Sequence, residues 1–388
     1  MDSVKLNRGL ISGGSLDNAG FARDVADKIK LKMREVAGRS GEKIPYTAAN
    51  GVFDDQTQKN ICWWTNGFWG GMMWQLFNAT GEELFKEKAL KNEEQLDADL
   101  MIAAGLDHDN GFKWLPTAGA DHTITGSKAA FNRLRLAADN LLGRFNLAGS
   151  FFRAWNDDDG LRAGWAIIDC MMNLPLLYRM SDYLNDPRYR LAAVKHADTA
   201  IKYFVREDGS VNHIVEFDPA TGEFIKTQGG QGMAVGSTWT RGQAWAVYGF
   251  TLSYIHTGEQ RFLDTAVKAA DFFTGHLKDA DRITVPVDFS QPGEIEWEDG
   301  TAAAIASCGL LELSGILGEK GAKYRSFADR LLKTLADSRT DWDPATDNLL
   351  TKCTAAYHDK NHDFPIIYGD YFFIEAIFKL TGEELFIW

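Results

Sequence analysis

The chain contains 388 residues, of which 45% are hydrophobic and 24% are charged, a composition typical of a globular protein. Its formal net charge of −13 argues against nucleic acid or an anionic membrane as a partner, because both require a basic surface. An acidic ligand would therefore need a local cationic patch. The four cysteines form no Cys-x-x-Cys pair and do not cluster with histidine, so we expect reduced thiols and no metal site.

The N-terminus carries no apolar segment like that of a signal peptide, and no window approaches the length and hydropathy of a membrane span. We therefore expect a cytoplasmic protein that does not associate with a membrane. A periplasmic or secreted protein whose signal peptide has been removed would show the same pattern.

Helical periodicity dominates the chain. Apolar residues fall on one face in residues 188–205 and again in residues 259–276. Between such segments a Thr-Gly-Glu turn recurs at residues 80–82, 257–259 and 381–383. Its glycine ends one helix, and its acidic residue begins the next, where the helix dipole favours negative charge.

Looser versions of this turn occupy residues 185–189 and 318–324, and residues 120–150 leave room for one more. Helical hairpins at this spacing predict a repeat architecture, which we expect to close as an all-α (α/α)6 toroid. An open solenoid is the alternative. Closure is favoured because the last unit, residues 371–388, stays apolar to its final residue and lacks a polar cap.

The predicted ring is a single domain over residues 16–388 that follows a tail of residues 1–15, with its first helix starting near residue 20. Two stretches break the helical pattern. Residues 206–238 alternate polar and apolar side chains around a Pro-Ala-Thr-Gly turn, which predicts a β-hairpin, and a Gly-rich run follows. Residues 281–300 are also irregular, and long loops on a helical ring usually form the mouth of its cavity.

Polar and aromatic residues gather in a few segments of otherwise apolar sequence. Residues 62–71 contain Trp63, Trp64 and Trp69, which predict either a wall that stacks sugar rings or ordinary core packing. Residues 107–112 place a histidine between two aspartates, a pattern typical of a turn or of an acid/base site.

Two further segments carry isolated charges. Asp169 is the only charge within residues 163–178, which we predict to be an apolar helix. A buried carboxylate is either paired or raised in pKa, so Asp169 is a candidate general acid or a structural cap. Arg241 lies between Trp239 and Trp245, an arrangement that could hold a carboxylate between sugar-stacking rings or form a structural salt bridge.

Taken together, these segments resemble the unsaturated glucuronyl hydrolases, glycoside hydrolase family 88. The fold of that family is an (α/α)6 barrel, in agreement with the repeat pattern. The motifs stand in the family's order and span most of the chain: W-W-T-x-G-F-W-x-G at 63–71, H-D-x-G-F at 108–112, I-I-D-x-M-M-N-L-P-L-L-Y at 167–178, T-R-G-Q-A-W at 240–245 and Y-G-D-Y-F-F-x-E-A at 368–376.

The resemblance implies a hydrolase that releases the unsaturated uronic acid from the non-reducing end of saccharides left by polysaccharide lyases. It implies Asp109 and Asp169 as the catalytic residues. No cofactor or metal is expected, the partner is a di- or oligosaccharide with an unsaturated uronic acid, and the protein is a monomer or homodimer. The residues implied to bind the sugar are Trp64, His108, His213, Gln231, Trp239, Arg241 and Trp245.

The implied chemistry is hydration of a vinyl ether, because the C4=C5 double bond of the substrate is next to the ring oxygen. Asp169 would protonate C4 and activate the water that adds at C5, after which the hemiketal opens and expels the neighbouring sugar. Asp109 would be the second carboxylate. We expect two ionised neighbours to repel each other, so that one keeps its proton above the usual Asp pKa and activity peaks at roughly pH 5.5–7.

One segment departs from the family pattern. Some members contact a substrate sulfate through serine and lysine residues just before the motif at 368–376, whereas here residues 356–360 keep only the lysine, Lys360. Lys360 is thus a candidate substrate contact, while a preference for sulfated substrates is in doubt. The alternatives are an unsaturated rhamnogalacturonyl hydrolase acting on pectin fragments, an epimerase-like toroid that uses core histidines, and a non-catalytic sugar-binding toroid.

Overall fold

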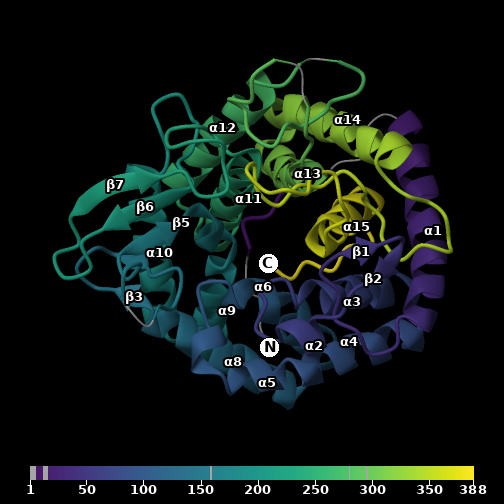
Figure 1. Ribbon diagram of the computed structural model, residues 1–388, viewed down its shortest axis with the longest axis horizontal. Coiled ribbons are helices and arrows are strands. Elements are labelled where there is room, and N and C mark those ends of the chain that lie inside the picture. Colours follow the sequence, from purple (N-terminus) through teal and green to yellow (C-terminus); the bar gives the residue numbers. More distant parts are fainter. Residues whose placement is uncertain (1–5, 12–15, 158–159, 279, 294–295) are drawn as a thin grey trace.

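Six helical hairpins form a closed ring in the computed structural model, which describes residues 6–11, 16–157, 160–278, 280–293 and 296–388 (Figure 1). Each hairpin has one almost fully buried inner helix and one amphipathic outer helix. The predicted all-α (α/α)6 toroid is confirmed. The inner helices are α3 (Phe68–Thr80), α6 (Asn110–Trp114) with α7 (Ala120–Thr125), α9 (Leu174–Leu184), α11 (Thr240–Thr257), α13 (Gly300–Leu317) and α15 (Ile367–Thr381). The outer helices are α1 (Leu16–Arg39), α4 (Glu83–Gln95), α8 (Lys128–Gly143), α10 (Pro187–Tyr203), α12 (Gln260–Gly275) and α14 (Ala322–Ser338).

The recurring glycine turns end inner helices as predicted. Gly81, Gly258 and Gly382 adopt φ values of 70°, 71° and 76°, the left-handed conformation that stops a helix. The third turn, however, precedes no helix, because residues 383–388 run irregularly into the middle of the ring (Figure 1). The outer partner of α15 is instead α1 from the other end of the chain, and α15 also packs against α3, which closes the ring.

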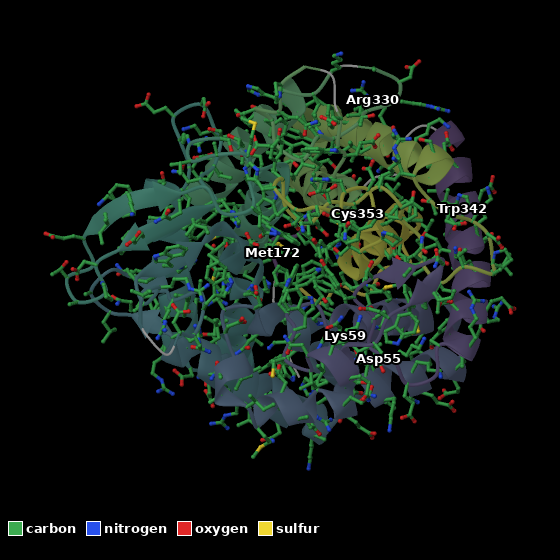
Figure 2. The ribbon with its side chains drawn as sticks, in the orientation of Figure 1. Asp55, Lys59, Met172, Arg330, Trp342 and Cys353 are labelled. Carbon is green, nitrogen blue, oxygen red and sulfur yellow. The ribbon has the colours of Figure 1, made fainter. Side chains whose placement is uncertain are left out.

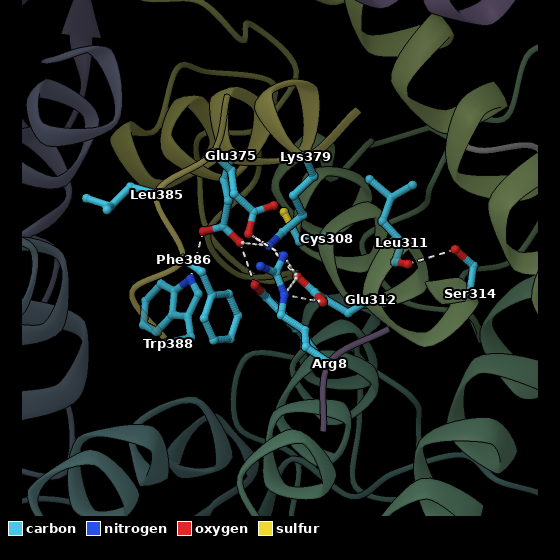
Figure 3. A network of polar contacts seen from close by, with 12 residues as sticks. Arg8, Cys308, Leu311, Glu312, Ser314, Glu375, Lys379, Leu385, Phe386 and Trp388 are labelled. Carbon is cyan, nitrogen blue, oxygen red and sulfur yellow. Dashed lines mark hydrogen bonds and ion pairs between the residues drawn. The ribbon is translucent and has the colours of Figure 1, made fainter. Parts of the chain in front are cut away.

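Buried charges join both ends of the described chain to the ring (Figure 3). Arg8, in the predicted tail, donates to Glu312 across 2.8 Å, and Lys379 contacts the same carboxylate across 2.7 Å. The indole of Trp388 donates to Glu375 across 2.7 Å. Because a buried charge is tolerated only when it is paired and hydrogen-bonded, this network fixes how both segments pack inside the ring.

The predicted hairpin is confirmed as β6 (Ile214–Phe217) paired antiparallel with β7 (Phe224–Gln228). A third strand, β5 (Trp165–Ile167), pairs with β6 and extends the sheet at one side of the ring (Figure 1). The other short strands are β1 (Ala48–Ala49) with β2 (Val52–Phe53) and β3 (Phe145–Asn146) with β4 (Phe151–Phe152). Other short helices are α2 (Gln56–Lys59), α5 (Asp97–Leu100), 3-10 turns at Ala103–Gly105 and Gly318–Gly321, and a π-helical turn, Leu115–Gly119, that joins α6 to α7.

The prediction that Asp169 lies within an apolar helix is wrong. Strand β5 ends at Ile167, a 3-10 helix covers Ile168–Met172, and α9 begins only at Leu174. Pro175 in the first turn of α9 explains this start, because proline is well suited to the first turn of a helix. Asp169 is therefore held in a tight turn between a strand and a helix.

Side chains fill the interior of the ring. Met172 and Cys353 lie in the middle of the molecule and are fully buried, whereas Arg330 and Trp342 lie toward its outer edge (Figure 2). All four cysteines are free. Contrary to the prediction from sequence, residues 300–338 include a window apolar enough to span a membrane, but 83% of this window is buried inside the ring.

Candidate active site

A cavity of about 620 Å³ lies at the end of the ring where the inner helices begin. Loops that lead into α3, α6, α9, α11 and α15 supply its wall. Of the residues predicted from sequence, it brings together Trp64, His108, Asp109, Asp169, His213 and Gln231. The full lining is Tyr46, Asn60, Cys62, Trp63, Trp64, Ala104, Gly105, Asp107, His108, Asp109, Trp155, Ile167, Asp169, His213, Gln231, Ala355, Ala356, Asp359 and Tyr368.

Asp109 occupies the N-cap position of α6, inside the cavity. Its Oδ2 lies 3.4 Å from Nε2 of His108, and its Oδ1 accepts a hydrogen bond of 3.3 Å from the amide of Asn173. Burial raises the pKa of Asp109 well above its usual range, and the nearby carboxylates of Asp107 and Asp169 raise it further. Asp109 therefore carries a proton under conditions in which an exposed aspartate is ionised.

Asp169 is the second carboxyl group in the cavity. Burial raises its pKa to about 7, while the positive charge of Arg241 acts in the opposite direction. Nε2 of His213 lies 3.8 Å from Oδ1 of Asp169. Because Nδ1 of His213 accepts the backbone N–H of Gln231 across 3.0 Å, the neutral ring carries its proton on Nε2, facing Asp169.

Both histidines are neutral near pH 7. Burial lowers the pKa of His108 to about 4 and that of His213 to about 3. No lysine or arginine belongs to the lining that the described residues provide, so the expected cationic patch is not found there. An anionic sugar would instead meet neutral donors and the N-terminal ends of the inner helices, where the helix dipole is positive.

Arg241 lies behind the cavity wall and is 1% exposed. Its Nη1 donates to Asp299 across 2.8 Å and to the backbone oxygen of Thr354 across 2.6 Å, and its Nη2 donates to the backbone oxygen of Ala355. These contacts occupy the guanidinium fork, so the structure favours the structural salt bridge over a direct grip on a carboxylate. Through Ala355, Arg241 holds a loop that lines the cavity.

The other predicted residues outside the lining are Trp239, Trp245 and Lys360. The ring of Trp239 packs against His213 with centroids 4.3 Å apart, and the guanidinium carbon of Arg241 lies 4.4 Å from the centroid of the same indole. Trp245 is buried one layer deeper, against Phe112. Lys360 is exposed beside the cavity. Trp239 and Trp245 thus support residues of the wall.

An aromatic wall forms one part of the cavity, and reasoning from sequence found only some of its members. Trp64 packs against Tyr368 with centroids 4.9 Å apart, and Trp63 and Trp155 also line the space. Trp69 instead belongs to the core, with 2% exposure, so the Trp-rich segment serves both predicted purposes. Trp155 comes from a loop and Tyr368 from the first turn of the almost fully buried helix α15, and periodicity gives no signal for either.

Asn173 is the most informative residue that sequence reasoning passed over. Asn173 belongs to the same sequence motif as Asp169, and its amide donates a hydrogen bond to Asp109. Its position in an apolar segment, four residues after the lone carboxylate, was the signal in the sequence that could have identified it. Among the described residues, no group of three or more His, Cys, Asp or Glu side chains is placed to hold a metal ion.

Comparisons with known proteins agree with this geometry. Residues 38–281 match the family model described as Glycosyl Hydrolase Family 88. The chain is 32% identical to an unsaturated glucuronyl hydrolase of Bacillus sp. strain GL1, with 94% of this chain and 97% of the relative covered. It is 30% identical to an unsaturated chondroitin disaccharide hydrolase of Streptococcus pneumoniae strain ATCC BAA-255 / R6, covering 84% and 83%.

A solved structure of a substituted UGL with the saccharide dGlcA-Glc-Rha-Glc superposes with a TM-score of 0.85 at 30% identity, covering 92% of this chain and 96% of that one. Family model, sequence relatives and structural neighbour thus agree over most of the chain. The chain therefore belongs to glycosyl hydrolase family 88 and is a glycoside hydrolase of the unsaturated glucuronyl hydrolase type.

Proposed function

We propose that this enzyme hydrolyses the unsaturated uronic acid from the non-reducing end of lyase-generated oligosaccharides, with Asp109 and Asp169 as its catalytic residues. The observation that carries the proposal is that both carboxyl groups lie in one aromatic cavity and both have raised pKa values. A carboxyl group that keeps its proton near neutral pH can act as a general acid there.

In this proposal Asp169 donates its proton to C4 of the uronate ring, which leaves positive charge shared by C5 and the ring oxygen. The carboxylate of Asp169 then accepts a proton from the water that adds at C5. The product is a hemiketal, which opens to a ketone and releases the neighbouring sugar with its oxygen. The general acid is thus regenerated, and no residue forms a covalent bond to the sugar.

Asp109 has a different part in this proposal. Since it also keeps its proton, it can donate a hydrogen bond to the uronate, as can Nε2 of His213. Stacking on Trp64 would hold the flat unsaturated ring, because an sp2-rich ring presents an apolar face. We further propose that Arg241 acts indirectly, by holding Ala355 in the wall and by limiting the rise in the pKa of Asp169.

The sugar that leaves is a finer point of the proposal. Ala355 and Ala356 line the cavity without hydroxyl groups, Asp359 adds a carboxylate, and Lys360 is exposed outside the lining. An anionic wall at this position disfavours a sulfated neighbour. We therefore propose that unsulfated disaccharides are better substrates than sulfated ones.

The test uses loss of the ultraviolet absorbance of the conjugated double bond when enzyme is added to defined unsaturated disaccharides. Chondroitin-derived disaccharides, sulfated and unsulfated, are compared with pectin-derived rhamnogalacturonan disaccharides. Rapid loss with unsulfated chondroitin disaccharide supports the proposal. Turnover of the pectin fragment alone would point to a rhamnogalacturonyl hydrolase, and binding without turnover would point to a sugar-binding protein.

We also propose that the protein is cytoplasmic and is a monomer or homodimer. The free cysteines fit a reducing compartment. Cell fractionation with an antibody against the native chain tests the location, and light scattering of the purified protein tests the assembly.

A further inference from the structure

A second cavity, of about 530 Å³, lies behind one wall of the catalytic cavity. Ala103 and Leu106 line this second cavity, whereas Ala104, between them in sequence, lines the first. The side-chain amide of Asn156 donates to the backbone oxygens of Ala103 (3.4 Å), Ala104 (3.2 Å) and Leu106 (2.8 Å). The wall shared by the two cavities is therefore held from the side of the second.

The polar lining of the second cavity is cationic. Arg144 and Arg153 contribute the charges, Asn140, Asn146 and Asn156 contribute amides, and no carboxylate from the described part of the chain belongs to the lining. This contrasts with the formal net charge of −13 for the whole chain. Two arginines share one cavity without an acidic partner in its lining.

Arg144 has a structural role that explains its own position. Its Nε donates to the backbone oxygen of Arg153 across 2.9 Å, its Nη1 to that of Leu106 across 2.9 Å, and its Nη2 to that of Ala154 across 3.0 Å. Arg144 also caps the C-terminus of α8, where the helix dipole favours a cation. These contacts leave its charge without an ion pair among the described residues.

Arg153 has no such explanation. Its buried Nε has no hydrogen-bond partner, and the side chain forms no ion pair with the described residues. Burial lowers the pKa of Arg144, the carboxylate of Asp107 in the first cavity partly opposes this, and the like charge of Arg153 lowers the pKa further. A buried donor without an acceptor and two like charges side by side are both unfavourable, and an anion would relieve both at once.

We propose that this second cavity binds an oxyanion, the sulfate or carboxylate group of an acidic saccharide or the free inorganic ion. Guanidinium forks match the planar or tetrahedral oxygens of such groups and bind them through paired hydrogen bonds. The site is separate from the catalytic carboxyl groups, because none of the residues that line it belongs to the catalytic cavity.

The proposal is tested by calorimetric titration of the full chain with sodium sulfate, against sodium chloride at equal ionic strength. Arg153→Gln removes the charge that has no structural task, and Arg135→Gln on the exposed side of α8 is the matched control, with 52% of its side chain exposed. We expect sulfate to bind the parent and the control equally, and to bind Arg153→Gln at least about tenfold more weakly, since the bidentate contact is lost. Absence of sulfate binding to the parent, or an unchanged Kd in Arg153→Gln, overturns the proposal.

A second pair of titrations distinguishes the source of the anion. N-acetylgalactosamine 6-sulfate is compared with N-acetylgalactosamine, in the parent and in Arg153→Gln. If the parent binds the sulfated sugar but not the unsulfated one, and the variant binds the sulfated sugar more weakly, the ligand is a saccharide. If free sulfate binds and neither sugar does, the ligand is an inorganic ion. If the sulfated sugar and free sulfate each bind the parent and Arg153→Gln with the same Kd, the proposed site is contradicted. If Arg153→Gln does not fold, Arg153→Lys replaces it, with weaker binding expected because the fork is lost while the charge remains.

Discussion

The side-chain amide of Asn173 donates to Oδ1 of Asp109 across 3.3 Å. The same nitrogen lies 3.4 Å from the backbone oxygen of Asp169, and Oδ1 of Asn173 accepts the backbone N–H of Phe112 across 2.8 Å. Asn173 therefore joins the turn that carries Asp169 to the start of the helix that follows Asp109. One buried side chain sets the relative positions of the two candidate catalytic groups.

Asn173→Leu keeps the volume of this side chain and removes its donor and acceptor. We expect kcat to fall by roughly 10–100-fold, since leaving the buried polar groups that Asn173 contacts without a partner costs about 1–3 kcal/mol. The hydrogen bond from Asn173 also stabilises ionised Asp109, so the pKa of Asp109 should rise further in the variant. Steady-state kinetics at several pH values measures both effects. A parent-like kcat and pH profile would show that Asn173 only fills space.

Asp169→Asn tests the general acid directly. The amide has no proton to give to C4, so kcat should fall by roughly 10²–10⁴-fold, the usual contribution of a positioned acid, while substrate binding is kept. The matched control is Asp370→Asn. Asp370 is also buried with a pKa of about 7, but its oxygens accept the backbone N–H groups of Leu349 and Leu350 outside the cavity. If kcat falls in Asp370→Asn but not in Asp169→Asn, Asp169 is not the general acid.

The pH dependence follows from the raised pKa of Asp169. The protonated form is the active one, so kcat should be high below pH 7 and fall as the pH rises through about 7. Burial is the main cause of this raised pKa. Since burial also raises the pKa of Asp109 well above its usual range, we expect Asp109 to hold its proton, and so to carry no repelling charge, while Asp169 titrates. This differs from the simple mutual repulsion expected from sequence.

Asp109→Asn should accordingly lower kcat but leave the alkaline limb of the kcat profile near pH 7. A limb that moves clearly to lower pH in this variant would show that the charge of Asp109 does tune Asp169. The measurement is a kcat profile of parent and variant in buffers of constant ionic strength.

The fold was predictable because turn glycines such as Gly81 and Gly258 mark the helix ends in the sequence itself. The environment of Asp169 was not predictable, because an apolar run of this length fits a buried strand and turn as well as a helix. The pairing of β5 with β6, which decides between the two, is a contact between segments far apart in the sequence. Cavity residues in motifs, such as His108, were found. Arg241 was misplaced because α11 is buried on every side, so periodicity cannot say which face meets the cavity.

Arg241 offers a test of structural support against direct binding. Arg241→Lys keeps the charge but not the fork that contacts Asp299, Thr354 and Ala355, so Tm should fall while the alkaline limb of kcat stays near pH 7. Arg241→Gln also removes the charge that lowers the pKa of Asp169, so its alkaline limb should move to higher pH. A large rise in KM in Arg241→Lys with an unchanged Tm would instead support direct contact with the uronate.

The Gly-rich loop contains a pair of glycines that separates backbone strain from contact with the site. Gly230 and Gly236 have φ values of 58° and 85°, both in the left-handed region that disfavours other residues. A Cβ on Gly230 would lie 2.1 Å from Nδ1 of His213, whereas a Cβ on Gly236 would meet nothing within 4 Å. Gly230 thus allows the loop to approach the ring whose Nδ1 accepts the N–H of Gln231.

Gly230→Ala and Gly236→Ala should each cost roughly 1–2 kcal/mol of stability from the left-handed backbone alone. Only Gly230→Ala should also displace His213, and with it the Nε2–H that faces Asp169, so kcat/KM should fall in this variant and stay near the parent value in the other. Thermal unfolding and kinetics of both variants make the comparison. Equal losses of activity would mean that loop strain, rather than the position of the His213 ring, limits the reaction.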